Sequence, residues 1–239
     1  MSACDILLLM RLHRFYIDSK IEGGKFEVTD TDLLYQWQKV FRFKIGDKVL
    51  IFNGEGFEFL AVFETISRES VVLTVEEKKE IKEKKKTELN IFQSIIKKDN
   101  FEFVVQKCTE LGVSAFYPIL SERSEKKNLN IERLEKIAIE ASEQSGRNSI
   151  PKIFEPQNLK EAVESFDGKL FVLDFEGKNI SEVDVSGKIG ILVGPEGGWG
   201  DTEKSWFKEK GIVSLTLGKQ VLRAETASIS ASALILLEK

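Results

Sequence analysis

The sequence predicts two domains: a small β-barrel, and then an α/β domain whose mostly parallel sheet is covered by helices on both faces. Short β segments separated by turn residues fill the first 75 residues. From residue 89 onward, apolar strands alternate with amphipathic helices, a pattern typical of a parallel sheet. The highly charged stretch 77–88 lies between these patterns, so we predict domains at residues 1–76 and 89–239 joined by a linker.

Four segments of the first domain have the apolar and β-branched character of strands, at residues 12–17, 48–52, 57–64 and 71–75. Asn53 and Gly54 separate two of these strands and predict a hairpin, because both residue types tolerate a positive φ. A short helix at residues 32–40 is expected to interrupt the strands. These features favour a small barrel.

The second domain begins with an apolar strand at residues 89–96, followed by Asp99 as a helix cap. Apolar residues recur at helical spacing from Phe101 to Leu111, and Gly112 is expected to end this helix in the left-handed conformation. The same alternation continues, with strands at residues 113–120, 169–175, 189–193 and 212–217, and helices at residues 131–145, from Asp201 or Thr202 to Gly211, and at 225–237. This order predicts the parallel sheet.

Composition excludes several classes of protein. No apolar run approaches the roughly 20 residues of a membrane span, and an acid before the short apolar run near the start argues against a signal peptide. Cys4 and Cys108 lack metal-ligand spacing, so we expect no metal site and a reducing, cytoplasmic location. A net charge of −4 argues against indiscriminate coating of nucleic acid, so any RNA site must be a local basic patch.

Two glycine-bearing loops follow two of the predicted strands. Gly194-Pro-Glu-Gly-Gly-Trp199 follows the strand at 189–193, and the segment 217–227 follows the strand at 212–217. Ligands of open α/β sheets bind outside the carboxyl ends of the strands, so both loops are expected to open onto one crevice. Neither loop matches a dinucleotide fingerprint or a phosphate-binding loop, which favours a ligand without phosphates. A purely structural turn at 194–199 remains the alternative.

Several motifs together carry a resemblance to a known family. They are Arg11-Leu-His-Arg-Phe-Tyr16, Val40-Phe-Arg42 with Gly46-Asp47, Gln106 to Gly112, Glu122-Arg-Ser124, Glu140 to Arg147 before Pro151, Gly194 to Gly198, and Leu217 to Ala227. From Met10 to the end, the chain resembles the RsmE family of 16S ribosomal RNA uridine N3-methyltransferases, within the SPOUT class. It departs from the family at Gln36, Trp37 and Phe41. Relatives usually begin near Met10, so residues 1–9 are expected to be either an upstream extension or the product of a misassigned start.

The resemblance implies a PUA-like RNA-binding barrel and an α/β domain tied in a deep trefoil knot. It also implies a homodimer, S-adenosylmethionine as cofactor, and methylation of N3 of uridine 1498 in 16S ribosomal RNA of the small subunit. The positions carried over to the cofactor pocket are Leu173, Gly194, Glu196, Gly197, Leu217, Gly218, Leu222 and Arg223. Backbone atoms are expected to make most of these contacts.

Methylation of uracil N3 requires that the imide proton leaves, because the nitrogen lone pair is otherwise delocalised into the ring. We expect Arg223 to stabilise the developing uracil anion and either Glu196 or Glu225 to take the proton. In the alternative interpretation, either glutamate accepts hydrogen bonds from nearby loop amides and Arg223 is merely its salt-bridge partner. Trp199 is expected to pack in the core rather than stack on a base.

The target nitrogen lies on the Watson–Crick edge, so the uridine must be unpaired or extruded before the reaction. Basic residues near loop or strand ends are expected to position the surrounding RNA: Arg11, Arg14, Arg42, Lys97, Arg123 and Arg147. Three other functions remain open. They are a SPOUT methyltransferase acting on another ribosomal or transfer RNA base, a noncatalytic RNA-binding ribosome-assembly factor, and an NAD-dependent oxidoreductase, which the absent fingerprint disfavours.

Overall fold

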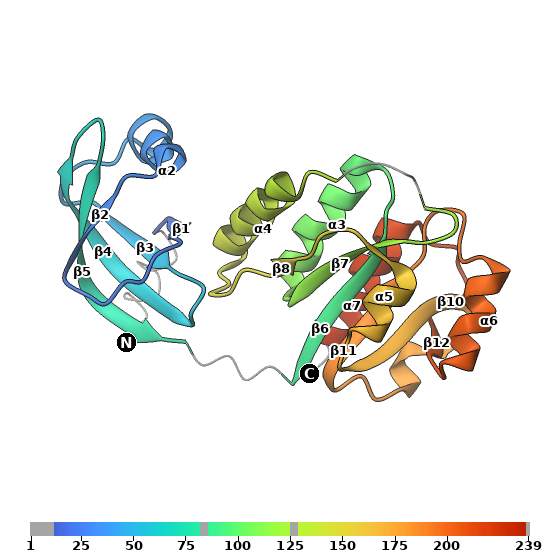
Figure 1. Cartoon of the computed structure of the whole chain (residues 1–239). Coiled ribbons are helices and arrows are strands. Elements are labelled where there is room, and N and C mark those ends of the chain that lie inside the picture. The colour runs from blue at the N-terminus through green and yellow to red at the C-terminus, as the bar shows by residue number, and fades with distance from the viewer. Residues whose placement is uncertain (1–11, 82–85, 125–128, 238–239) are drawn as a thin grey trace. The chain divides into compact units, whose positions relative to one another are not determined.

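The chain forms two compact units, Met1–Glu83 and Lys84–Lys239, each with its own core (Figure 1). The computed structural model describes residues 12–81, 86–124 and 129–237. The division between the units falls inside the predicted linker at 77–88. The suggested extension at residues 1–9 and Arg11 lie outside the described residues.

The first unit is built on one five-stranded sheet in the order β1-β3-β4-β5-β2. Its strands are β1 (Arg14–Tyr16), β2 (Lys25–Val28), β3 (Lys48–Phe52), β4 (Phe57–Ile66) and β5 (Val71–Glu80). β1 pairs parallel with β3, and the other pairings are antiparallel. Side chains of Phe15, Trp37, Phe59 and Phe63 fill the core between the sheet and a short helical segment. Trp37, one of the departures from the family pattern, is fully buried and therefore has a packing role.

The predicted hairpin and helix of this unit are both present. Asn53 Oδ1 accepts a hydrogen bond from the Glu55 amide, and Gly54 has φ +79° in the turn between antiparallel β3 and β4. The predicted helix is an α-helical turn, α2 (Thr31–Tyr35), that continues as a π-helix, η1 (Gln36–Phe41). Asp30 caps its start, and Arg42 ends it with φ +57°.

The strand β5 is longer than the sequence indicated. It continues through residues 77–80, which we predicted as linker, and there it pairs with the start of β4. Those residues are exposed and charged, so no apolar alternation marked them as a strand. The sequence also gave no signal for β2, whose four residues are mostly exposed or half-buried.

The second unit contains a seven-stranded sheet in which every pairing is parallel, as the alternating pattern predicted. The strand order is β12-β10-β11-β6-β7-β8, and β9 also pairs with β7. These strands are β6 (Thr87–Ser94), β7 (Ala115–Leu120), β8 (Lys152–Ile153), β9 (Gln157–Asn158), β10 (Lys169–Asn179), β11 (Gly187–Val193) and β12 (Val213–Thr216). The carboxyl ends of β10, β11 and β12 therefore meet at one edge.

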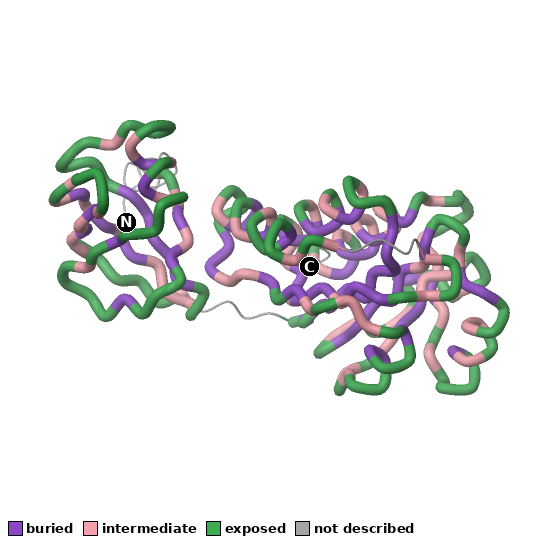
Figure 2. The backbone as a smooth tube through the Cα atoms, turned by 45° about the horizontal axis from the view of Figure 1, so that its top comes forward, coloured by how far each residue is buried: buried purple, intermediate pink, exposed green. Residues whose placement is uncertain are grey.

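Helices cover both faces of this sheet. On one face lie α3 (Lys98–Leu111), α4 (Ile131–Ser145) and α7 (Ala224–Leu237), whose apolar residues share a core with Leu89, Ile91 and Ile189. On the other face α5 (Leu159–Glu164) and α6 (Asp201–Glu209) pack against Phe92 and Leu192. A 3-10 turn, η2 (Ile180–Glu182), follows β10. Buried backbone runs along the central strands of each unit (Figure 2).

The helix boundaries follow the predicted stop signals more closely than the predicted starts. Gly112 and Gly146 adopt left-handed conformations and end α3 and α4 as expected. Asp99 is not the cap of α3, because Lys97 holds the capping position and Asp99 lies in the first turn, where its charge favours the helix dipole. Similarly, Gly200 and not Asp201 or Thr202 precedes α6. Among the described residues, no helix is long and apolar enough to cross a membrane.

Candidate functional site

The two glycine loops border one cavity of about 450 Å³ at the carboxyl ends of β10, β11 and β12. All the positions that we carried over to the cofactor pocket line it: Leu173, Gly194, Glu196, Gly197, Leu217, Gly218, Leu222 and Arg223. The expectation that both loops open onto one crevice is therefore confirmed. The order β12-β10-β11 explains this convergence, since it brings three strand ends together from distant parts of the sequence.

Trp199 fixes the first loop to the strand end beside it. Its indole Nε1 donates to the carbonyl of Leu173 at 3.0 Å, and its ring meets Phe207 edge-on at a centroid distance of 5.0 Å. The side chain is only 4% exposed, so it packs in the core, as the sequence interpretation favoured. A Cβ on Gly194 would lie 3.2 Å from this ring, which leaves little room for any side chain there. The close packing explains glycine at this position.

Two further glycines shape the loops through their backbone. Gly198 has φ +68° and Gly218 has φ +129°, conformations that residues with a Cβ rarely adopt. The first loop is also tied to α6, because the Gly200 amide donates to Glu203 Oε2 at 2.9 Å. These contacts make the loop an ordered wall of the cavity.

A third segment, residues 121–124, completes the site. The other carboxylate oxygen of Glu203, Oε1, accepts from the Glu122 amide at 2.8 Å, and Arg123 Nη1 donates to the Gly197 carbonyl at 2.9 Å. Arg123 therefore lines the cavity, whereas the sequence suggested only an RNA contact. No pattern in the sequence indicated that Glu203 joins these loops.

Hydrophobic and charged side chains both line the cavity. Val193, Leu215, Leu217 and Leu222 contribute apolar surface. Asp174, directly after Leu173, accepts a salt bridge from Lys204 Nζ at 3.0 Å, and both residues line the cavity. No motif in the sequence pointed to this pair, although Asp174 follows a predicted pocket residue. An apolar lining with a few polar groups is typical of small-molecule sites.

The three predicted catalytic residues are not equally placed. Arg223 and Glu196 line the cavity and are exposed, and neither forms a salt bridge within the described parts of the chain. Glu225 is in the first turn of α7 and does not line the cavity. Its Oε2 is buried, and no described residue hydrogen-bonds to it. The alternative in which Arg223 serves as a salt-bridge partner of these glutamates is therefore not seen.

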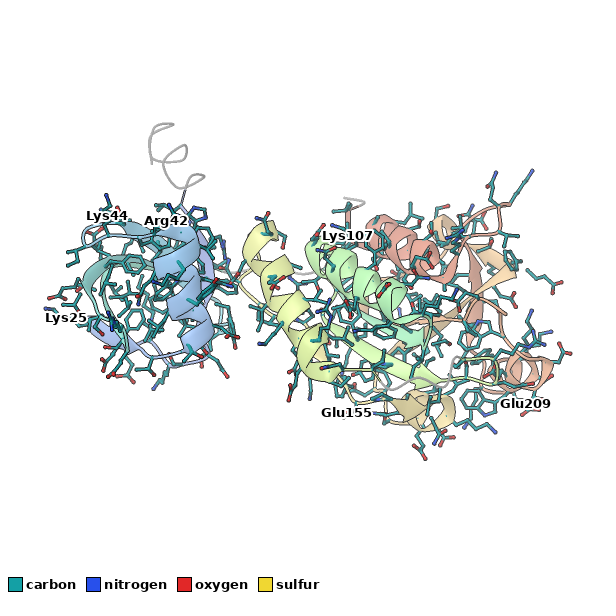
Figure 3. All side chains as sticks on the ribbon, turned by 90° about the horizontal axis from the view of Figure 1, so that it is seen from above. Lys25, Arg42, Lys44, Lys107, Glu155 and Glu209 are labelled. Carbon is teal, nitrogen blue, oxygen red and sulfur yellow. The ribbon has the colours of Figure 1, made fainter. Side chains whose placement is uncertain are left out.

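The predicted RNA-binding residues occupy different environments. Arg42 and Lys97 are exposed, and Arg42 lies with exposed Lys44 on one side of the first unit (Figure 3). Arg14 pairs with Glu58 at 2.8 Å and lies over the Phe52 ring, with a side chain only 15% exposed. Its contacts are those of a structural residue.

Arg147 requires a correction, because its side chain lies in the interior. The residue is 7% exposed, and its Nη1 donates to the carbonyl of Thr109 in α3 at 2.7 Å. The guanidinium therefore holds the end of α4 against α3 instead of facing RNA. A position just after a helix-ending glycine suggested exposure, but the sequence did not reveal which carbonyl it would meet.

A buried polar network lies behind the cavity. Ser228 of α7 donates to the side-chain oxygen of Gln93, whose Nε2 donates to the Ser94 carbonyl at 3.0 Å. Ser121 Oγ donates to Ser94 Oγ at 3.0 Å. Gln93 is the register partner of Val193, directly before the first glycine loop. The network thus joins α7, β6 and the 121–124 segment.

The described residues contain no cluster suited to hold a metal ion.

Comparison with known proteins agrees with this architecture. Residues 82–236 match the family model of an RNA methyltransferase domain, and residues 38–76 match an RNA methyltransferase PUA domain. Ribosomal RNA small subunit methyltransferase E of Rickettsia conorii is 32% identical over 94% of this chain and 95% of its own length. The Bacillus subtilis protein of the same name is 29% identical over 88% of this chain and 89% of its own.

Solved structures show the same fold. Ribosomal RNA small subunit methyltransferase E from Neisseria gonorrhoeae, bound to S-adenosylmethionine, has a TM-score of 0.85 and 27% identity, and covers 94% of this chain and 97% of its own. A Legionella pneumophila protein in complex with the same cofactor has a TM-score of 0.87 and 29% identity, with the same coverage. The chain therefore belongs to the ribosomal RNA small subunit methyltransferase E family, in which a PUA domain precedes an RNA methyltransferase domain.

Proposed function

We propose that this protein transfers a methyl group from S-adenosylmethionine to N3 of uridine 1498 in 16S ribosomal RNA of the small subunit. The observation that carries the proposal is that all the cofactor positions expected for this family line one cavity. Relatives named as small-subunit ribosomal RNA methyltransferases and cofactor-bound structures of the same fold support it. The proposal thus names S-adenosylmethionine as the methyl donor and uridine N3 as the acceptor atom.

The residues of the cavity fit such a cofactor. A volume of about 450 Å³ lies in the range of sites for drug-sized ligands, and the apolar lining suits an adenine ring. Gly194 leaves room for the Trp199 ring, whereas a Cβ on Gly218 would meet only the Gln220 side chain within 4 Å, so the absent side chain of Gly218 leaves the backbone of the second loop accessible to a ligand. When bound, S-adenosylmethionine supplies an electrophilic methyl group on its sulfonium. Holding this group next to the acceptor is the task of the two loops.

We propose that Arg223 and Glu196 act directly on the uracil. If the imide pKa lies about two units above neutral, ionising it costs about 2.7 kcal/mol, an amount that one positioned cation can offset. The Arg223 guanidinium, which forms no salt bridge with a described residue, would stabilise the uracil anion by donating to a carbonyl oxygen. Glu196, which lines the same cavity, is better placed than Glu225 to take the proton.

We propose that the PUA domain and the exposed cations Arg42 and Lys97 position the RNA around the extruded uridine.

We further propose that two copies associate through α3 and α7. Phe103 is 45% exposed on α3, and Leu234 and Leu237 are 37% and 62% exposed on α7. A dimer would cover this apolar surface. We also propose that the α/β domain is tied in a trefoil knot and that the protein acts in the cytoplasm.

Ribosomal RNA from a deletion strain, with and without the restored gene, tests the proposed function. Digestion and mass spectrometry should show N3-methyluridine at the target position only when the protein is present. If the protein instead restores a methyl group on a different ribosomal or transfer RNA base, that base is the substrate and the proposed uridine is not. Titration calorimetry with S-adenosylmethionine forms the second arm, because a noncatalytic assembly factor with a vestigial pocket gives no saturable heat.

A further inference from the structure

Arg123 is held against the wall of the cavity by contacts on both its polar and its aliphatic parts. Its Nη1 donates to the Gly197 carbonyl at 2.9 Å. A Cβ built on Gly197 would lie 3.4 Å from Arg123 Cδ and 3.5 Å from its Cβ, so the side-chain stem lies over this glycine. The guanidinium is therefore positioned at the cavity before any ligand arrives.

The backbone beneath Arg123 is also fixed. The carboxylate of Glu203 accepts from the Glu122 amide at 2.8 Å and from the Gly200 amide at 2.9 Å, and thus bridges the two segments. Ser124 Oγ accepts from the Ser121 amide at 2.8 Å and closes the turn. These bonds limit the motion of the loop that carries Arg123. A long side chain on such a loop loses less entropy when it binds a ligand.

The charge of Arg123 has no partner among the described residues. Lys204, the neighbouring cation of the cavity, already pairs with Asp174 at 3.0 Å. No acidic group of residues 12–81, 86–124 or 129–237 forms a salt bridge with Arg123, and its only hydrogen bond within these ranges uses Nη1. A guanidinium has five N–H donors in a planar fork, which suits the two oxygens of a carboxylate or phosphate. The other N–H groups of Arg123 donate to no described residue, so they can bind a ligand.

We propose that Arg123 binds an oxyanion at the cavity, either the carboxylate of the methionine part of the cofactor or a backbone phosphate of the RNA. The proposal rests on the proposed function, which supplies both anions. The observation behind it is a guanidinium that is held on the wall of a ligand cavity and has no acidic partner in the part of the chain that the structure describes. Arg123 would thus be a ligand-binding residue of the cavity, distinct from Arg223, which we assign to the uracil.

The test uses the full chain as wild type, Arg123→Gln and Arg123→Lys, with Lys208→Gln as the matched control. Lys208 is an exposed cation of α6 that does not line the cavity, so its loss changes the net charge equally. Thermal unfolding verifies that each variant is folded. Calorimetry measures the Kd of S-adenosylmethionine and of its decarboxylated analogue, and filter binding measures the affinity for 16S ribosomal RNA at several salt concentrations.

If Arg123 binds the cofactor carboxylate, Arg123→Gln should raise the Kd of S-adenosylmethionine by about tenfold or more and leave the Kd of the decarboxylated analogue unchanged. Arg123→Lys should restore part of the affinity for S-adenosylmethionine. Binding of a phosphate predicts unchanged cofactor affinity, weaker RNA binding, and a salt slope reduced by about one. Equal losses for both cofactor forms would instead show a structural role and overturn the proposal. Unchanged affinity for cofactor and RNA would overturn it as well.

The proposed function fails separately from this inference. A wild-type protein that binds no S-adenosylmethionine would remove the cofactor assignment, whereas the RNA measurements would still decide whether Arg123 contacts phosphate. If the wild type and the Arg123 variants instead bind S-adenosylmethionine and RNA with the same affinities, the proposed function stands and the inference about Arg123 is wrong.

Discussion

Arg223 joins the ligand cavity to the start of a helix. Its carbonyl accepts a hydrogen bond from the Ala227 amide at 2.9 Å, and α7 begins at the next residue, Ala224. Its side chain lines the cavity and forms no salt bridge with another described residue. The backbone of Arg223 is thus held by secondary structure while the guanidinium stays available to a ligand.

Replacement of Arg223 should therefore affect chemistry more than folding. We expect Arg223→Ala to lower the single-turnover methylation rate by about 100-fold, as removal of a charge-stabilising donor does in other enzymes, with the unfolding midpoint little changed. Lys219→Ala is the control, because Lys219 is an exposed cation of the same loop that does not line the cavity. Wild-type rates for Arg223→Ala would remove this residue from the proposed mechanism.

Single residues of the site were predictable where a backbone rule applied to them. Gly194 packs against the Trp199 ring and Gly198 has a positive φ, and the positions of both glycines relative to a buried strand are visible in the sequence. The environments of Arg123 and Arg147 were not predictable, because their carbonyl partners, Gly197 and Thr109, lie 74 and 38 residues away in the chain. Sequence spacing contains no information on such distant contacts.

Among the elements, long amphipathic helices were predicted best. α4 occupies residues 131–145 as expected, since its apolar spacing and the glycine after it define both ends. α5 was missed because its six residues are too few to display a helical period. The short strands β8 and β9, of two residues each, were missed for the same reason. Periodicity identifies an element only when the element contains several repeats.

The buried contact between α7 and β6 has a measurable energetic consequence. Ser228 and Gln93 are both fully buried, and the serine hydroxyl donates to the glutamine oxygen. Ser228→Ala leaves that oxygen without its partner, so we expect the free energy of unfolding to fall by about 1–3 kcal/mol. Urea denaturation measures this loss. Ser230→Ala, on the same helix at a half-buried position, serves as the control, and an equal effect there would contradict the assignment.

The ion pair between α3 and α4 should make stability depend on pH. Glu102 accepts from Arg133 Nε at 2.6 Å and Nη2 at 2.8 Å, and these contacts hold the pKa of the Glu102 carboxyl below its usual range. A lowered folded-state pKa stabilises the protein above the unfolded-state pKa, and the stabilisation disappears as the pH falls through the folded-state value.

Glu102→Gln should therefore lower the urea midpoint at pH 7, and its effect should shrink as the pH falls through the lowered folded-state pKa, where the wild-type carboxyl takes up its proton. The matched variant is Glu135→Gln, an exposed glutamate of α4 that forms no salt bridge with a described residue. A difference between Glu102→Gln and wild type that persists unchanged at low pH would exclude the ion pair as its source.

At the scale of the whole molecule, the two units have separate cores and separate tasks. The aromatic core of the first unit contains Phe63, which is fully buried, and none of its residues lines the cavity of the second unit. The change from short strands to strand–helix alternation made this division visible in the sequence. The strand order β12-β10-β11-β6-β7-β8 was not visible, because pairing partners are chosen by tertiary packing. The trefoil knot stays a prediction.

A substitution that creates an empty space in the core of the first unit should leave cofactor binding intact. We expect Phe63→Ala to destabilise that unit by about 3–5 kcal/mol, the usual cost of deleting a buried aromatic ring. Calorimetric unfolding should show one transition moved to lower temperature, while the Kd of S-adenosylmethionine at a temperature where both units are folded stays within about twofold. A large loss of cofactor affinity would show that the two units are coupled.

Trp199 gives the cavity an intrinsic optical signal. Its indole packs against Gly194 and donates to the Leu173 carbonyl, so its ring touches the wall that a ligand would contact. Trp37 is buried in the other unit, and Trp206 lies on α6 without lining the cavity. Fluorescence emission from Trp199 therefore reports on the filling of this site without any attached dye, and replacement of the other two indoles would isolate that signal.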